Sequence, residues 1–308
     1  MNRRTFITAA AAVSMAQTLP NALYATTETV AAPVKRPSPH RWQPTSVTST
    51  WLGQSTILLN MFGVHILTDP VLFNAVGVRL FGATYGHTRL TKPPLAVQEI
   101  PKPDIVLLSH AHMDHTDRQS LEYLSTTYPE QISVLCAKNT RDVIHDLPWA
   151  SLRELDWWES ITVHGITISA VEVLHNGARF PWDPDRRDGT RNGRSYNGYC
   201  MQSGGCTLFF AGDTAMTESV RELQSLRIDA AFMPIGAYHG YSRFHCTPEE
   251  ALAMSAMIGA RMTAPVHCMT FNQSDEPFSE PMQRYQSAVR DHTTRSGWQY
   301  IGEDWVIQ

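Results

Sequence analysis

The sequence has few cysteines, and none of them form a Cys-x-x-Cys pair. Zinc knuckles use such pairs, and disulfide-rich domains need a dense and even set of cysteines, so the sequence excludes both classes. We expect most of these side chains to be small buried hydrophobic groups. One disulfide bridge is the alternative. The five cysteines are Cys136, Cys200, Cys206, Cys246 and Cys268.

The N-terminal region has no apolar run near the roughly 20 residues that a membrane-spanning helix needs. It instead combines paired arginines, Arg3 and Arg4, with a shorter apolar run over 6–16 and small residues at Ala22 and Ala25. This order is typical of a twin-arginine export signal. We therefore expect removal of residues 1–25 and a periplasmic or otherwise exported protein, whose metal is bound before export.

The sequence also contains fewer basic than acidic residues. The formal net charge is −4 at pH 7, and removal of residues 1–25 takes away two arginines and no acids, which leaves −6. A duplex nucleic acid carries a dense negative charge, so we expect no nucleic-acid partner. The expected partner is a small-molecule or lipid substrate.

The chain contains enough apolar sequence for a large core, with 43% hydrophobic residues in a length of 308. Residues 26–46 carry four prolines among polar residues and are interpreted as a linker, so we place one domain at 47–308. Apolar strand-like runs alternate with helix candidates, which indicates an α/β fold. The predicted strands include TILLNMF, VHILTDP, DIVLLSH, ISVLCA, ITISAVEVL, CTLFFAGD and DAAFMPIG, and the predicted helices span 117–127, 140–146, 216–226, 248–258 and 281–294.

A cluster of metal-binding residue types follows one of these apolar runs. In the stretch LLSHAHMDHTD, over residues 107–117, the donors His110, His112, Asp114 and His115 lie on the loop after a predicted buried strand. Imidazole nitrogens and carboxylate oxygens are ligands that zinc and similar divalent metals prefer. An accidental histidine cluster on a surface loop is the alternative interpretation.

The His-x-His-x-Asp-His pattern resembles the signature of the metallo-β-lactamase superfamily. The resemblance implies an αβ/βα four-layer sandwich (the metallo-β-lactamase fold) and two divalent metal ions, which we expect to be Zn²⁺, although manganese and iron accept the same ligands. It also implies further ligands after other apolar runs, in VEVLHNG, FFAGDTA and APVHCMTF. By this resemblance His110, His112 and His175 hold one metal, Asp114, His115 and His267 hold the second, and Asp213 bridges both.

Further blocks of sequence resemble one branch of this superfamily, the N-acylphosphatidylethanolamine-hydrolysing phospholipases D. These blocks are TWLGQSTILL, ILTDP, ELDWWE, FFAGDT, MPIGAY and PEEA. The resemblance implies a hydrolase that uses a metal-bridging hydroxide to cleave a phosphodiester in a phospholipid-like substrate. A lactonase on the same scaffold and a non-catalytic metal-binding protein are the alternatives. The stretch after His175 departs from the family pattern.

Two residues outside the ligand set match family positions. Asp69, in LTDP, corresponds to a carboxylate that orients a metal-binding histidine, although an Asp-Pro pair also forms turns. His245, in FHCTPEEA, precedes a predicted helix start and corresponds to a histidine that acts on the substrate, so we expect a general acid or a phosphate contact. A histidine without a catalytic part is the alternative for His245.

Two surface features have open interpretations. Five arginines occur in the stretch 178–198, which is either a lid that grips an anionic head group or a loop with self-neutralising charges. An apolar segment precedes GATYGHTRL and is either buried core or a peripheral membrane contact. The arginines are Arg179, Arg186, Arg187, Arg191 and Arg194, and the apolar residues are Leu72, Phe73, Val76, Leu80 and Phe81.

Overall fold

The computed structural model describes residues 34–188 and 192–307. The predicted export signal lies outside these residues, so it stays a prediction, as do the domain limits at residues 25 and 46. Residues just before the first long strand already contact the domain, because the Lys35 amide donates a hydrogen bond of 2.8 Å to the Ile301 carbonyl. Within the described ranges, no helix combines the length and the apolar character that crossing a membrane requires.

The first of two seven-stranded sheets holds the N-terminal strands in the order β16-β1-β2-β3-β6-β7-β8. Its strands pair antiparallel from β16 to β3 and parallel from β3 to β8. The bounds are β1 (Val47–Gly53), β2 (Thr56–Met61), β3 (Val64–Thr68), β6 (Ile105–Leu108), β7 (Ser133–Ala137), β8 (Ser151–Leu155) and β16 (Asp304–Ile307).

The second sheet has the order β15-β14-β13-β12-β11-β10-β9 and the same division into an antiparallel and a parallel half. In each sheet, several parallel strands therefore end at the same edge. The loops that follow these strands are free to carry functional side chains. The bounds are β9 (Ser160–Val163), β10 (Ile166–Glu172), β11 (Asn197–Ser203), β12 (Cys206–Phe210), β13 (Ala230–Pro234), β14 (Met262–Val266) and β15 (Arg295–Ser296).

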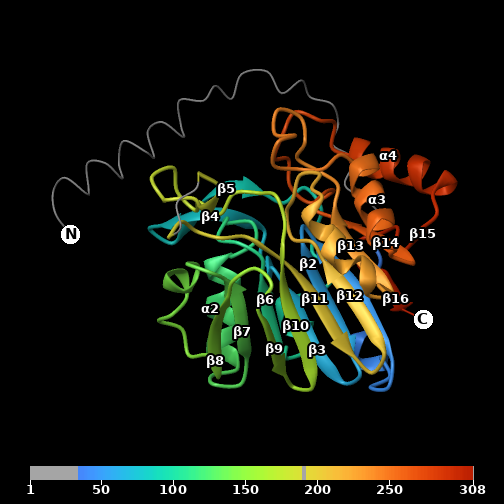
Figure 1. Cartoon of the computed structure of the whole chain (residues 1–308). Helices are drawn as coiled ribbons and strands as arrows, with labels where there is room; N and C mark the ends of the chain where they lie inside the picture. The colour runs from blue at the N-terminus through green and yellow to red at the C-terminus, as the bar shows by residue number, and fades with distance from the viewer. Residues whose placement is uncertain (1–33, 189–191, 308) are drawn as a thin grey trace. The chain divides into compact units, whose positions relative to one another are not determined.

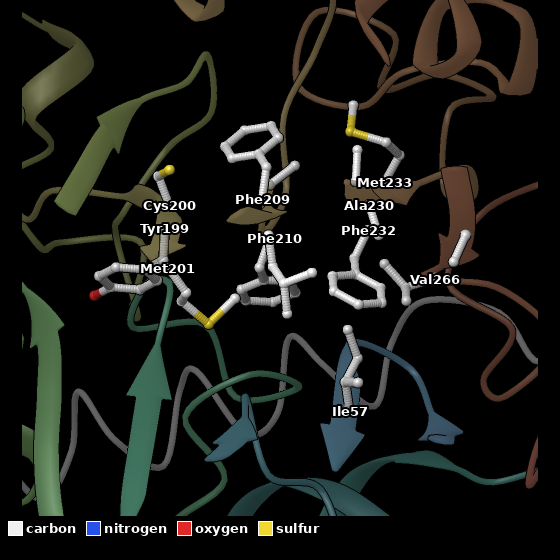
Figure 2. Close-up of a cluster of buried hydrophobic side chains, with 14 of the residues drawn as sticks. Ile57, Tyr199, Cys200, Met201, Phe209, Phe210, Ala230, Phe232, Met233 and Val266 are labelled. Carbon is white, nitrogen blue, oxygen red and sulfur yellow. The ribbon is translucent and has the colours of Figure 1, made fainter. Parts of the chain in front are cut away.

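Residue alternation along the strands separates the two cores. In β2, Ile57 and Leu59 belong to the core between the sheets, whereas Leu58 belongs to the core beneath α2 (Arg118–Thr127). Figure 2 shows Ile57 pointing toward Phe232 of the opposite sheet. The helices α3 (Pro248–Met257) and α4 (Glu280–Ala288) cover the second sheet, with α3 in contact with β13 (Figure 1). The predicted αβ/βα four-layer sandwich is confirmed.

The predicted helices are confirmed in part. The helix at 248–258 begins as expected, because the Thr247 side chain accepts from the Glu250 amide and the Glu250 side chain accepts from the Thr247 amide. The predicted helix at 281–294 is too long, because α4 ends at Ala288 and a 3-10 turn, η6 (Val289–Asp291), follows.

Two helix predictions are wrong. Residues 140–146 form only the 3-10 turn η3 (Arg141–Val143), because side chains, including that of Arg118, take up carbonyls there and Pro148 disfavours continuation. Residues 216–226 contain the 3-10 helix η5 (Ser219–Ser225), where the Thr217 hydroxyl accepts from the Ser219 amide and competes with α-helical bonding. The other 3-10 turns are η1 (Pro39–Arg41), η2 (Val97–Glu99) and η4 (Arg186–Asp188).

A separate hairpin of β4 (Ala75–Leu80) and β5 (Ala83–Thr88) lies apart from the two main sheets (Figure 1). The apolar segment that was predicted from the sequence is buried at one end and exposed at the other. Leu72 and Val76 are buried, whereas Phe81 at the hairpin tip is 99% exposed. Core burial is therefore confirmed for the first part of the segment only. All five cysteines are free, and only Cys206 is not fully buried.

One glycine permits the close approach of the two sheets at their functional edge. Gly212, after β12, has φ +62°, and a Cβ there would lie 2.7 Å from the Cβ of Ser109 in the other sheet and 2.9 Å from the Asn197 carbonyl oxygen. Only glycine adopts this backbone conformation freely and leaves that space. Gly212 therefore fixes the position of the next residue, Asp213, against the loop that follows β6.

We predict that Gly212→Ala lowers the free energy of unfolding by about 2–4 kcal/mol, because it combines backbone strain with a clash against packed atoms. Gly165→Ala is the matched control, since Gly165 has φ +78° and nothing within 4 Å of an added Cβ. The control should lose only about 1 kcal/mol. Urea unfolding of both variants measures the difference, and equal losses would contradict the packing argument.

Candidate metal centre

The predicted metal ligands come together at the shared edge of the two sheets. Strands β10 and β12 run in the same direction because both pair antiparallel with β11, and β12, β13 and β14 are parallel. Loops after β6, β10, β12 and β14 therefore meet at one end of the sandwich. These loops carry His110, His112, Asp114 and His115 after β6, His175 after β10, Asp213 after β12 and His267 after β14.

Three histidines form the first group of donors. The Nδ1 atom of His112 lies 2.9 Å from Nε2 of His110 and 3.3 Å from Nε2 of His175. Each ring offers one nitrogen, and these nitrogens lie within 4.8 Å of one another. Such a set of imidazole nitrogens is able to hold one divalent metal.

The second group contains two carboxylates and two histidines. Nε2 of His115 lies 3.1 Å from Oδ2 of Asp213 and 3.2 Å from Oδ2 of Asp114. Nε2 of His267 lies 3.0 Å and 3.3 Å from the same two oxygens. The four donor atoms are therefore close enough to coordinate a second cation, and all four residues were predicted from the sequence.

Asp213 joins the two groups. The Oδ2 atom that contacts His115 and His267 is also 3.9 Å from Nε2 of His175, which belongs to the first group. Among the described residues, the buried Asp213 Oδ1 atom has no hydrogen-bond partner. Leaving a buried polar atom unpaired costs about 1–3 kcal/mol, so the arrangement fits bound cations better than an empty cluster.

Hydrogen bonds to the outer nitrogens aim the first group inward. His112 donates through Nε2 to the Asn176 side chain at 2.7 Å, and His175 donates through Nδ1 to the Phe244 carbonyl at 2.9 Å. These bonds fix which nitrogen carries the proton, so that the opposite nitrogen keeps its lone pair. Sequence reasoning missed Asn176, although it stands directly after a predicted ligand.

Asp69 orients histidines of both groups, as its family position predicted. His115 donates through Nδ1 to Asp69 Oδ2 at 2.7 Å, and the Ser109 hydroxyl donates to the same oxygen at 2.6 Å. Ser109 in turn accepts from Nδ1 of His110 at 2.9 Å. Asp69 and His267 both have left-handed backbone angles, φ 34° and 56°, which cost roughly 1–3 kcal/mol each and are typical of functional sites.

Two glutamines hold the remaining carboxylate. The amide groups of Gln54 and Gln273 each donate to Asp114 Oδ2 at 2.7 Å, and Gln54 also donates to the Gln273 side chain. Sequence reasoning missed both residues. Gln54 lies within the TWLGQSTILL block, but nothing in the local pattern showed that residues 60 and 219 positions further along would meet it.

The two groups differ in their electrostatics. Burial lowers the pKa of His110 and His175 well below the usual value, so the first group consists of neutral imidazoles. Burial alone would also lower the pKa of His115 and His267, but the carboxylates around them, Asp213 foremost, raise it, for His267 to about 9. Without metal, protons on these histidines balance the buried carboxylates.

His245 lies beside the cluster and is partly exposed. Its Nδ1 atom is 3.8 Å from Asp213 Oδ2, and its ring lies 5.0 Å from that of His175 and 5.3 Å from that of His267. Burial lowers the pKa of His245 to about 4, so the ring is neutral at pH 7. The position is compatible with contact to a substrate and also with a place among the donors, because His175, Asp213 and His245 form a third close group.

This geometry agrees with the comparison of the whole chain with known proteins. The family model described as the β-lactamase superfamily domain matches residues 65–268. An isothiocyanate hydrolase from Delia radicum gut bacteria has a similar fold, with a TM-score of 0.64 and 20% identity over 85% of this chain and 100% of its own. A metal-dependent hydrolase of Methanosphaerula palustris is 27% identical over 76% of this chain and 91% of its own. The fold and the donor groups define a metal-dependent hydrolase.

The chain belongs to the β-lactamase superfamily. Within it, the chain is similar to the predicted branch, since the N-acyl-phosphatidylethanolamine-hydrolyzing phospholipase D of Saccharomyces cerevisiae is 32% identical over 78% of this chain. The chain spans 51% of that enzyme's length. An uncharacterized protein of Mycobacterium tuberculosis is 29% identical over 86% of this chain and 70% of its own.

We predict that Asp69→Asn weakens metal binding by about 10- to 100-fold, because His115 and His110 lose the charged acceptor that orients them. Competition with a fluorescent chelator measures the affinity, and unfolding of the metal-free protein checks stability separately. Asp104→Asn is the control, since Asp104 is a carboxylate of the same sheet that binds Lys102 and the His65 amide. Unchanged affinity in Asp69→Asn would contradict the orienting role.

Proposed function

We propose that this chain is a dinuclear metal-dependent phosphodiesterase that acts on a phospholipid-like substrate. The observation that carries the proposal is the position of Asp213, whose Oδ2 atom contacts the carboxylate-histidine group and reaches the three-histidine group. A carboxylate placed between two donor groups is suited to bridge two cations. The similarity to the yeast and Caenorhabditis elegans enzymes, whose names give N-acyl-phosphatidylethanolamine as substrate, supports the substrate class.

The residues present fit two divalent cations of the zinc type. The first group offers only neutral imidazole nitrogens, and the second offers two carboxylates and two imidazoles, which are common zinc ligands. Two cations in such groups lower the pKa of water to near 7 and polarise phosphoryl oxygens, which supplies a nucleophile and stabilises negative charge. No nucleophilic serine or cysteine is required.

The protein's own side chains would perform three tasks around the reacting phosphate. In the metal-free chain His115 and His267 hold the pKa of Asp213 well below the usual range despite burial, and bound cations would take over this stabilisation of its negative charge. The hydrogen bonds of Asp69, Asn176 and the Phe244 carbonyl keep the imidazoles in place, so little reorganisation accompanies reaction. His245, beside this cluster, would donate an N–H to a phosphate or leaving-group oxygen.

We predict that wild-type protein contains about two metals per chain and that Asp213→Ala loses activity toward bis(4-nitrophenyl) phosphate by about 1,000-fold or more. The variant lacks the carboxylate oxygen that lies near donors of both groups. Metal analysis by mass spectrometry and a spectrophotometric assay measure the two effects. Asp213→Asn keeps the side-chain size and guards against a folding defect.

Asp229→Ala is the matched control, because Asp229 is a buried carboxylate that binds Arg261 and the Thr207 amide. Full activity in Asp213→Ala would rule out the bridging role. A panel of lactones assayed in parallel tests the alternative enzyme, since hydrolysis of lactones without any phosphodiester turnover would overturn the proposed reaction. Bound metal without hydrolysis of any ester would indicate a non-catalytic protein.

For His245 we predict that substitution by glutamine lowers kcat by about 100- to 10,000-fold while the metal content stays unchanged. The reason is that His245 would act on the substrate and not as a required ligand. Measurement of kcat and metal content on the same preparation separates the roles. Loss of about one metal per chain would show that His245 is a ligand, and unchanged kcat would remove it from the reaction.

A further inference from the structure

The two surface features with open interpretations differ in how their side chains are used. In the arginine-rich stretch after His175, Arg179 donates to two carbonyl oxygens of the loop that carries the histidine motif, at 2.7 and 2.9 Å. Arg186 and Arg194 form ion pairs with aspartates, so the interpretation of self-neutralising charges holds for them. The apolar segment, in contrast, ends at a hairpin tip whose side chain stays exposed.

The tip of this hairpin is a two-residue turn with an unusual first residue. Leu80 pairs with Ala83, so Phe81 and Gly82 form the turn between β4 and β5. Both turn residues have left-handed backbone angles, φ 51° and 82°. Asparagine followed by glycine favours such a turn, whereas a bulky phenylalanine is strained there. The Phe81 side chain is therefore expected to make a contact that offsets the strain.

A second turn of the same kind has such a contact. Phe62 and Gly63 join β2 to β3 and have φ 54° and 91°. The Phe62 ring packs on Gly204 so closely that a Cβ on this glycine would lie 2.6 Å from a ring carbon. The packing leaves Phe62 only 37% exposed, compared with 99% for Phe81. The same Phe-Gly turn is therefore covered by the chain in one hairpin and uncovered in the other.

The base of the uncovered hairpin is joined to a loop of the metal centre (Figure 1). Val76 of β4 belongs to a small buried cluster with Phe271. The Leu90 amide, just after β5, donates a hydrogen bond of 2.8 Å to the Thr270 carbonyl. Thr270 and Phe271 lie on the loop after β14, which also carries the donor His267. The hairpin therefore stands at the same end of the sandwich as the donor groups.

The sequence around the hairpin has no acidic side chain. Residues 70–98 contain no aspartate or glutamate, although the chain carries 29 acidic residues in all. They include the exposed cation Lys92, and also Arg79, which pairs with Glu122 of α2 at 3.3 Å. The hairpin therefore has no negative charge of its own that anionic lipid headgroups would repel.

The size of the exposed surface favours a lipid bilayer over a protein partner. An aromatic side chain such as Phe81 buries about 200 Å² at most contacts, whereas a stable protein interface buries about 800 Å² per partner. Leu80 and Tyr85 share one face of the hairpin and are 36% and 49% exposed, so they add only part of the difference. A bilayer needs no complementary surface, and a few aromatic and apolar side chains enter its headgroup boundary.

We propose that the tip of the β4–β5 hairpin, with Phe81 at its centre, enters the headgroup boundary of a lipid bilayer and holds the metal centre beside it. Burial of the Phe81 ring in lipid would offset the strain of its backbone. The choice of a lipid partner rests on the proposed function, because a phospholipid-like substrate lies in such a bilayer. The proposal adds where on the chain that bilayer is met.

Co-sedimentation of the full chain with vesicles of phosphatidylcholine and phosphatidylglycerol tests this contact. We expect wild type to bind these vesicles and Phe81→Asn to bind about 10- to 100-fold more weakly, because the aromatic ring no longer enters the lipid. Asparagine suits the left-handed turn, so the variant should unfold at no lower urea concentration than wild type. A loss of vesicle binding would then not come from a folding defect.

Phe62→Asn is the matched control, because it makes the same substitution in the same kind of turn. This turn precedes β3, which runs parallel to β6, so it lies at the end of the sheet opposite the donor groups. Phe62→Asn should keep the vesicle binding of wild type. All three chains share the same N-terminal residues, so a difference between them reports the hairpin.

Equal vesicle binding by wild type and Phe81→Asn, or no binding by wild type, would overturn the bilayer contact. A wild-type dimer in analytical ultracentrifugation that Phe81→Asn dissociates would overturn it as well, because a second copy of the chain would then cover the tip. Vesicle binding needs no turnover. The absence of phosphodiesterase activity would therefore refute the proposed function and leave the binding result independent.

Discussion

The structure depends on one buried carboxylate that has to stay negative where little water reaches it. Asp213 is 3% exposed, and one of its oxygens lies close to imidazole nitrogens of two donor groups. An isolated charge in such a place would be very costly, so positive partners must accompany it. Protons on His115 and His267 meet this need in the metal-free chain, and divalent cations would displace them because ligand imidazoles must be neutral.

The two sheets bring these charges together without opening the core. In both sheets the parallel strands end at the same edge. Gly212 lets the second sheet approach Ser109 of the first sheet. The strained backbones of Asp69 and His267 persist because packed strands on both sides determine them. Outside the cluster, the Phe244 carbonyl orients His175, and His245 follows Phe244 in the chain.

The fold and the convergence of the ligands could be predicted because a local motif carries a family resemblance, which then identified the distant ligands. Four donors lie within six residues, and each distant ligand follows an apolar strand. Gln54 and Gln273 left no such signal, since a polar side chain that meets its partner through long-range packing looks like any surface residue. The same limit applies to the arginines, because the partners of Arg194 lie far apart in the chain. The helix predictions at 140–146 and 216–226 were wrong because side-chain hydrogen bonds outweighed helical propensity there.

Anomalous X-ray diffraction at a zinc absorption edge, from crystals of metal-loaded protein, tests the shared carboxylate most directly. Two peaks are expected, one among His110, His112 and His175 and the other among Asp114, His115 and His267, with Asp213 in contact with both. A single peak, or two peaks of which only one touches Asp213, would contradict the bridge. Either result would require a different source for the nucleophile.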